Sequence, residues 1–126
     1  MIAIGTKGRA DVVVNDNNTA AAAGSGDLMV FSTPSMIALM EKASHDSIAP
    51  YLDQGQGSVG THLDVKHLAA TPLGKNVYAE SEVTFADERK VSFKVSAYDE
   101  TGLIGEGTHQ RAIITKDRFM KKCSER

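Results

Sequence analysis

The feature that most constrains the fold is a period of two in side-chain polarity through the second half of the chain. Residues 58–68, 76–86 and 89–98 alternate apolar and polar side chains, and residues 103–115 form a further apolar segment with glycines near its start. Such alternation is typical of antiparallel strands that pack one face and leave the other in water. The pattern therefore predicts four long antiparallel strands.

The first half of the chain predicts one helix and short strands. The stretch FSTPSMIALMEKAS begins with Thr33 as the expected helix N-cap and Pro34 at the first helical position, and Pro50 should end the helix near residue 49. Residues 12–14 and 28–31 are expected as short strands. The order of these elements predicts an α+β fold in which one helix packs on one antiparallel sheet.

Composition limits the class of protein. The 126 residues suit a single domain, 1–126, whose residues 116–126 are expected to form a charged C-terminal tail. A net charge of −2 gives no electrostatic reason to expect nucleic acid or an anionic membrane as partner, and no apolar run approaches the roughly 20 residues that span a bilayer. The one cysteine, Cys123, permits no internal disulfide and suits a cytoplasmic location.

One charged side chain interrupts the apolar face of the predicted helix. At about 100° per residue, five apolar residues cover nearly half of the circumference, and Glu41 falls beside Ile37 at the edge of that stripe. On a simple surface helix Glu41 would be a boundary residue that reaches for water. The alternative is a carboxylate placed at a site between the helix and the sheet.

His67 raises the same question on the sheet. It continues a predicted inward face made by Val59, Thr61, Leu63 and Val65, so its ring should point towards the helix. It could be a hydrogen-bonded core residue or a catalyst. The coincidence favours a site, because a hydroxyl from Thr33, a carboxylate from Glu41 and this imidazole all point to one layer.

The chain resembles the hotdog-fold thioesterases, of the group that includes the fluoroacetyl-CoA thioesterases. The resemblance runs from about residue 19 to 114 and rests on GSGDLMVFSTPSMIALMEKAS, GQGSVGTHLDVKHLAATPLGKNVYAE and GEGTHQRAII. It implies one central helix on a curved antiparallel sheet and hydrolysis of an acyl-CoA thioester. It further implies that Thr33, Glu41 and His67 are the catalytic set, that Gly60 lines the acyl site, and that Arg111 orients Glu41 or contacts the ligand. Arg111 could equally be a surface residue at a strand end.

One departure affects the expected substrate. The fluoroacetate-specific enzymes have aromatic residues before the helix, whereas residues 17–27 here, NNTAAAAGSGD, have none. We therefore expect a small or medium acyl-CoA rather than fluorine selectivity, and no cofactor. The scattered histidines 45, 62, 67 and 109 predict no metal site. Two other functions stay open: a non-catalytic protein that binds acyl-CoA or an acyl carrier, and a dehydratase-type hotdog enzyme.

The spacing of the candidate residues predicts an oligomer. Glu41 follows Thr33 by eight positions, which is about 12 Å along a helix, so both cannot reach one thioester carbon from the same chain. We therefore expect a two-fold symmetric homodimer with two composite sites, each using Thr33 of one chain and Glu41 of the other, with Glu41 as base or nucleophile. The resemblance implies the same arrangement.

Overall fold

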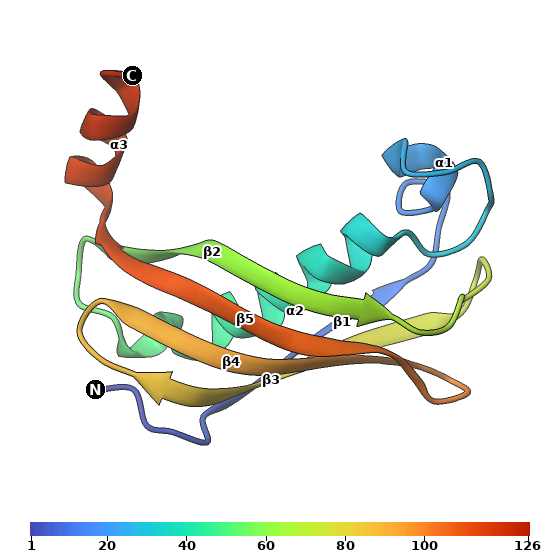
Figure 1. The fold of residues 1–126 in the computed structure, drawn as a ribbon, viewed down its shortest axis with the longest axis horizontal. Coiled ribbons are helices and arrows are strands. Elements are labelled where there is room, and N and C mark those ends of the chain that lie inside the picture. The colour runs from blue at the N-terminus through green and yellow to red at the C-terminus, as the bar shows by residue number, and fades with distance from the viewer.

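The protein forms one curved sheet wrapped around one long helix. The computed structural model covers residues 1–126. Figure 1 shows the elements, which are β1 (Lys7–Val13), α1 (Ala20–Ala23), α2 (Thr33–Ile48), η1 (Ala49–Tyr51), β2 (Gln56–His67), β3 (Asn76–Ala86), β4 (Lys90–Asp99), β5 (Leu103–Thr115) and α3 (Lys116–Ser124). The predicted α+β fold and the four long strands are confirmed.

The sheet is antiparallel throughout, with strands in the order β1-β3-β4-β5-β2. Tight turns join β3 to β4 and β4 to β5. In the first, the Asp87 carboxylate accepts hydrogen bonds from the backbone N–H groups of Arg89 and Lys90, at 2.8 and 2.7 Å. This order leaves β1 and β2 as the two edges, and β2 carries His67 at its end.

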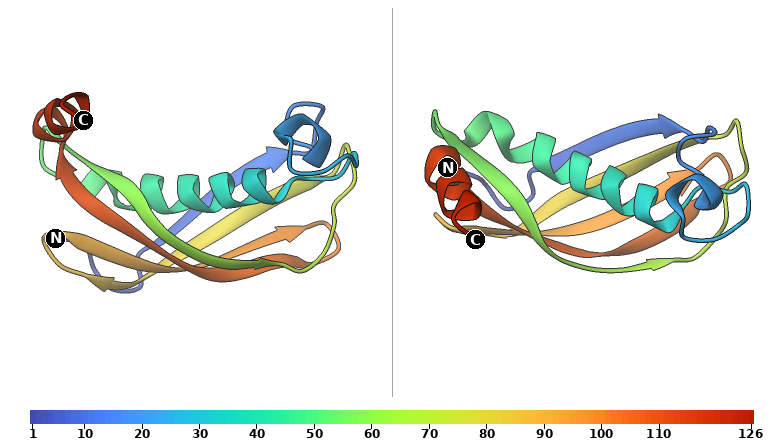
Figure 2. Two further views of the ribbon diagram at one scale, coloured as in Figure 1. Left: turned by 45° about the horizontal axis from the view of Figure 1, so that its top comes forward. Right: turned by 90° about the horizontal axis from the view of Figure 1, so that it is seen from above.

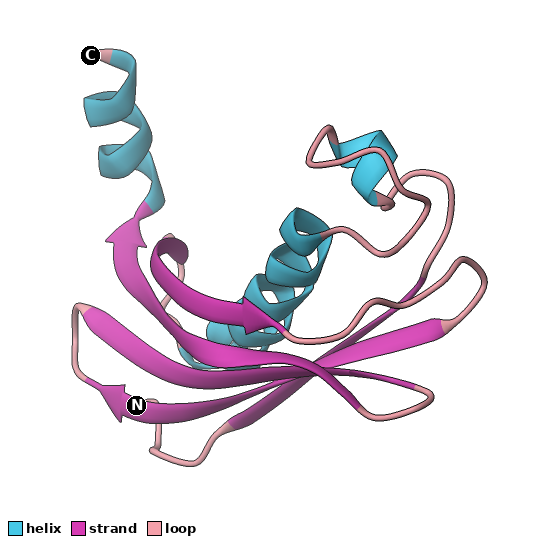
Figure 3. Ribbon diagram, turned by 45° about the vertical axis from the view of Figure 1, so that its right-hand side comes forward, coloured by secondary structure: helices cyan, strands magenta, loops and turns pink.

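Helix α2 lies in the concave face of the sheet, as Figures 2 and 3 show from three sides. Four of the five residues of the predicted apolar stripe are buried, whereas Ile37 is only partly buried, and Ser44 and Ile48 are buried as well. They pack on inward residues of β3 and β4, such as Val77, Val83 and Phe93, to form the core. A helix held by this burial presents its remaining face, which includes Glu41, along one edge of the core.

The start of α2 differs from the prediction by one residue. Ser32, not Thr33, is the N-cap, and its Oγ accepts a hydrogen bond from the N–H of Ser35 at 3.1 Å. Thr33 is the first helical residue, and Pro34 follows it. Serine and threonine cap equally by local chemistry, so sequence alone did not separate them. The consequence is that the Thr33 hydroxyl is free for another partner.

The inward face of β2 also differs from the prediction. A bulge between Gly60 and His62 inserts Thr61 as an unpaired residue, which reverses the alternation on its N-terminal side. Gly60 pairs with inward-facing Arg111, so Val59 and Thr61 do not share the face of Leu63. The expectation that His67 points inward is correct, because it lies beyond the bulge.

Two further predictions need correction. Residues 28–31 make only isolated bridges, between Phe31 and Thr19 and between Val30 and Pro72, instead of a strand. The four alanines before them form α1, which Thr19 caps and which ends at Gly24 in the left-handed conformation. Strand β3 has a second bulge near residue 84 that leaves Phe85 44% exposed.

The C-terminal segment, expected as a charged tail, is helical over Lys116–Ser124. None of the residues of α3 is buried, and the helix projects from the end of β5 (Figure 1). No helix of the protein is both long and apolar enough to cross a bilayer.

Candidate active site

The first polar cluster joins the start of α2 to the end of β2. The Oγ1 atom of Thr33 lies 2.7 Å from Nδ1 of His67, a hydrogen bond between residues 34 positions apart. The hydroxyl is available because Ser32 performs the capping. The structure thus brings together two of the three residues predicted as catalytic.

Burial favours the neutral form of the His67 imidazole. Desolvation by burial lowers its pKa below the usual value for histidine. Its Nε2 atom is buried and has no hydrogen-bond partner. A neutral ring with one nitrogen on a hydroxyl and the other unengaged can accept or deliver a proton.

A pocket opens beside this pair. It has a volume of about 420 Å³ and is lined by Thr33 and His67 together with apolar side chains that include Val30, Phe31 and Leu68. Residues 68–70, the first residue of α1, Ala20, and Ser25 form its other walls. A mostly apolar pocket with a hydroxyl and an imidazole at its base suits a short acyl chain next to a reacting group.

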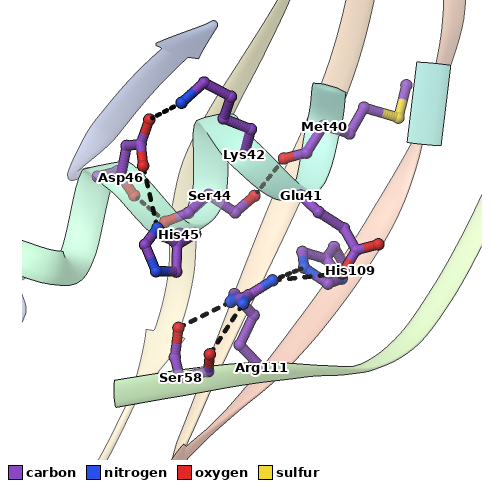
Figure 4. A network of polar contacts seen from close by, with 10 residues as sticks. Met40, Glu41, Lys42, Ser44, His45, Asp46, Ser58, His109 and Arg111 are labelled. Carbon is purple, nitrogen blue, oxygen red and sulfur yellow. Dashed lines mark hydrogen bonds and ion pairs between the residues drawn. The ribbon is translucent and has the colours of Figure 1, made fainter. Parts of the chain in front are cut away.

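A second polar cluster lies farther along α2, and Figure 4 shows it from close by. Nη1 of Arg111 lies 3.4 Å from Oε2 of Glu41. The Arg111 side chain is 7% exposed and that of Glu41 is 37% exposed, so the carboxylate reaches solvent while its cation is buried. Arg111 is therefore an internal residue paired with Glu41, so the surface alternative is wrong, and its role in orienting Glu41 or contacting the ligand stays a prediction.

Two residues of the sheet hold the guanidinium in place. Ser58 accepts hydrogen bonds from Arg111 through its Oγ at 2.9 Å and its carbonyl at 3.0 Å. His109 approaches from the neighbouring position on β5, with Nε2 3.2 Å from Nη1 of Arg111. Burial lowers the pKa of Arg111, and the charge of Glu41 opposes that change.

His109 is the residue of this cluster that sequence reasoning missed. It is fully buried, and its Nδ1 lies 2.8 Å from the carbonyl of His62. Because a carbonyl only accepts, Nδ1 carries the proton and Nε2 accepts from Arg111. Burial lowers the pKa of His109, in keeping with this neutral form. The available signal was its position two residues before Arg111, on the same face of a strand.

Gly60 admits the carboxylate to this cluster. A β-carbon at Gly60 would overlap Oε2 of Glu41 and lie 3.2 Å from Cε1 of His109. Gly60 thus lies directly against Glu41, and its predicted placement in the acyl site stays a prediction.

The two clusters are separate within one chain. Thr33 and Glu41 stand about 12 Å apart along α2, and Arg111 contacts only the second of them. Of the other histidines, His45 pairs with Asp46 on the exposed side of α2 (Figure 4). No group of three or more His, Cys, Asp or Glu side chains is placed to hold a metal ion.

Comparison with known proteins identifies the family. The profile of the family FlK, described as fluoroacetyl-CoA-specific thioesterase, matches residues 14–117. The fluoroacetyl-CoA thioesterase of Streptantibioticus cattleyicolor is 43% identical over 97 residues, which are 77% of this chain and 70% of that protein.

Solved structures agree with this assignment. A structure of the fluoroacetyl-CoA thioesterase FlK has a TM-score of 0.94 and 36% identity, and covers 100% of this chain and 98% of that one. A hypothetical protein of Thermus thermophilus, a thioesterase superfamily member, has a TM-score of 0.91 and 27% identity, with 99% and 93% covered. With this fold, this matched length and these identities, the chain belongs to the fluoroacetyl-CoA-specific thioesterase family of hotdog-fold thioester hydrolases.

Proposed function

We propose that the protein hydrolyses small or medium acyl-CoA thioesters to a free acid and CoA, in composite sites of a two-fold dimer. The observation that carries this proposal is the separation of the clusters. Thr33 and His67 stand beside an apolar pocket of about 420 Å³, while the oriented carboxylate of Glu41 lies about 12 Å away along the same helix. Family membership supports the thioester as the reacting group.

The start of α2 offers a donor for the developing oxyanion. Pro34 has no N–H, and the N–H of Ser35 is taken by the Ser32 side chain. The Thr33 N–H makes no hydrogen bond within the chain, so it can bind a thioester oxygen with help from the helix dipole. His67 would then move the proton, and the Thr33 hydroxyl would position water or the thioester.

Glu41 of the second chain would supply the attack. As a general base it takes a proton from water, whose oxygen adds to the carbonyl carbon, and the CoA thiolate leaves and is protonated. As a nucleophile it forms an acyl anhydride that water opens. Single turnover in ¹⁸O water, followed by mass spectrometry of the Glu41 peptide, detects the nucleophilic route in which water attacks the Glu41 carbonyl carbon of the anhydride, because only that route places ¹⁸O in the carboxylate.

An acyl-CoA panel tests the reaction. We expect measurable release of CoA from short and medium acyl groups, with no added metal or cofactor. Glu41→Gln keeps the shape of the side chain and should nearly abolish turnover. Lys42→Gln, one residue along on the exposed face of α2, is the matched control and should retain activity. A folded Glu41→Gln variant with wild-type turnover would refute this role, and a wild-type protein that binds every panel member without hydrolysis would be a binding protein.

Subunit mixing tests the composite site. Thr33→Val and Glu41→Gln should each be inactive as pure dimers. After co-refolding in equal amounts, about half of the dimers are mixed, and each mixed dimer keeps one intact site of two. Activity should return to about a quarter of wild type. If mass spectrometry shows mixed dimers and activity stays absent, both residues act within one chain.

The cytoplasm is the proposed compartment. Its support is the exposed free thiol of Cys123, which a reducing environment preserves.

A further inference from the structure

Helix α3 exposes an apolar face that nothing in its own chain covers. Phe119 and Met120 are 39% and 60% exposed, and Cys123 lies on the same face, four residues after Phe119. A helix of nine residues is too short to be stable in water without tertiary packing. Its other side chains include four basic residues against one acidic residue, Asp117. The helix therefore needs a partner surface that is apolar and acidic.

Such a surface lies at the far end of the β2 edge. Leu28, Met29 and Leu68 are 65%, 48% and 51% exposed. Leu68 lines the pocket beside Thr33 and His67, and Leu28 and Met29 directly precede Val30, which lines it as well. Residues 15–34 carry two acidic side chains, which are Asp16 and Asp27, and no basic one. In Figure 1, α3 and α1 rise at opposite ends of the β2 edge and on the same side of it. A two-fold axis through the middle of β2 exchanges these two ends.

The register of β2 gives the position of that axis. Strand β2 is an edge strand, free to pair with a second copy of itself. The composite site requires Gly60, which touches Glu41, to lie opposite the partner's His67. Thr61 is the extra residue of the bulge, so it is skipped when the pairs along the two antiparallel β2 strands are counted. Leu63 then pairs with the partner's Val65, and Asp64 pairs with the partner's Asp64. Every inward residue meets an inward residue, as antiparallel pairing demands.

This register brings α3 to the partner's pocket. Thr115 pairs with Gln56, and the N–H of Lys116 donates to the carbonyl of Gly55 at 2.9 Å, so α3 starts beside the beginning of β2. Continuing the same count, Gln56 lies beside the partner's Thr71. The start of α3 and the partner's residues 68–73 are separated by two strand spacings, which is roughly 10 Å. The helix is about 14 Å long, so it can span this distance.

We propose that α3 of each protomer packs on the partner's residues 25–30 and 68–73, and that Phe119 and Met120 form an outer wall of the pocket beside the partner's Thr33 and His67. The basic side chains of α3 meet the partner's Asp27. This deepens the proposed function and takes its register from the composite site. The rival surface is a groove of about 740 Å³ in the same chain, lined by Tyr51, Leu52 and Ile113 among others.

The natural Cys123 tests where α3 docks. In Leu28→Cys and Leu68→Cys proteins, a short bis-maleimide should link position 123 of one chain to the new cysteine of the other and yield a covalent dimer. Adding Cys123→Ser should abolish the link. The unsubstituted protein should stay uncrosslinked, because the two copies of α3 lie at opposite ends of the interface. A covalent dimer from neither variant, or an internal link in Tyr51→Cys monomers, overturns the proposal.

Kinetics test the wall of the pocket. Phe119→Ser should raise KM for the best acyl-CoA about tenfold with kcat little changed, because binding loses a buried aromatic contact. Phe119→Leu should restore most of the loss, and Ser124→Ala, an exposed position of the same helix that is neither apolar nor charged, is the matched control for general damage to α3. An unchanged KM in Phe119→Ser would contradict the proposal that Phe119 forms part of the pocket wall. Crosslinking needs no turnover, so links formed without hydrolysis would reject the proposed function alone, and missing links with successful subunit mixing would reject the docking alone.

Discussion

The two polar clusters differ in how firmly the fold holds them. The Thr33–His67 pair rests on one hydrogen bond of 2.7 Å at the open end of α2. In the other cluster, Arg111 is buried and makes contacts to Ser58, His109 and Glu41. The first cluster has an unengaged nitrogen beside a pocket, whereas the guanidinium of the second has little freedom.

This difference indicates a division of labour. In the proposed mechanism a proton moves at the first cluster, where Nε2 of His67 has no hydrogen-bond partner. The second cluster is proposed to hold the Glu41 carboxylate in one orientation at the edge of solvent, and there the paired cation, Arg111, is held by Ser58 and His109. Substitutions in the first cluster should therefore affect turnover with little loss of stability, and those in the second should affect both.

After the inactive Glu41→Gln and Thr33→Val variants, the largest effect on turnover is expected for His67→Ala. Loss of positioned proton transfer should lower turnover by about 10²–10⁴-fold. Acyl-CoA hydrolysis, corrected for the folded fraction from circular dichroism, measures it. A large loss of stability with unchanged turnover per folded molecule would instead make His67 a core residue, and the contrast between the clusters would fail.

The next largest loss of turnover is expected for Gly60→Ala. The added methyl group displaces the Glu41 carboxylate, whose side chain can swing away without disturbing the backbone. Turnover should fall about 10²-fold, the cost of misplacing a reacting group by about 1 Å, with a smaller decrease in the melting temperature because the methyl group also crowds Cε1 of buried His109. Gly57→Ala is the matched control on the same strand, because its new methyl meets the flexible end of Lys116. Equal activity in the two variants would remove Gly60 from the site.

A smaller effect on kcat is expected for two replacements of His109, and the two should differ in size. Glutamine can keep an acceptor for Arg111, whereas asparagine can keep a donor for the His62 carbonyl but loses that acceptor. We expect His109→Asn to lower kcat about tenfold and His109→Gln to lower it less, if orientation of Glu41 through Arg111 is what His109 provides. Steady-state kinetics measure kcat for both variants. A lower kcat in His109→Gln than in His109→Asn would contradict the positioning role.

The smallest effect concerns stability and pH. Burial lowers the pKa of both His67 and His109 in the folded protein, so the unfolded chain binds more protons below its usual histidine pKa of about 6.5. The free energy of unfolding should be at its full value above that pH and should decrease as the pH falls through it. Urea titrations between pH 5 and 8 measure the slope, which should be shallower in His109→Gln. A flat profile would mean that neither ring is held neutral.

The residues of the candidate site were predictable where the periodicity of a single helix or strand places them. The amphipathic stripe of α2 placed Glu41 at its edge, and the strand period placed His67 inward, both as observed. The face of Gly60 was not predictable by alternation, because the bulge at Thr61 reverses it. The anchoring of Arg111 by Ser58 joins residues 53 positions apart, and His109 carried no motif of its own.

The sequence by itself determined where the four long strands and the central helix lie, which side of that helix is apolar, and to which family the chain belongs. These properties depend on side-chain polarity at short range, which repeats with the period of each element. Only the tertiary structure decided which residue caps α2, where β2 changes face, and which partners surround Arg111. Those outcomes depend on register between strands distant in sequence. A shift of one residue there exchanges the buried and exposed faces of a strand, and no local pattern records it.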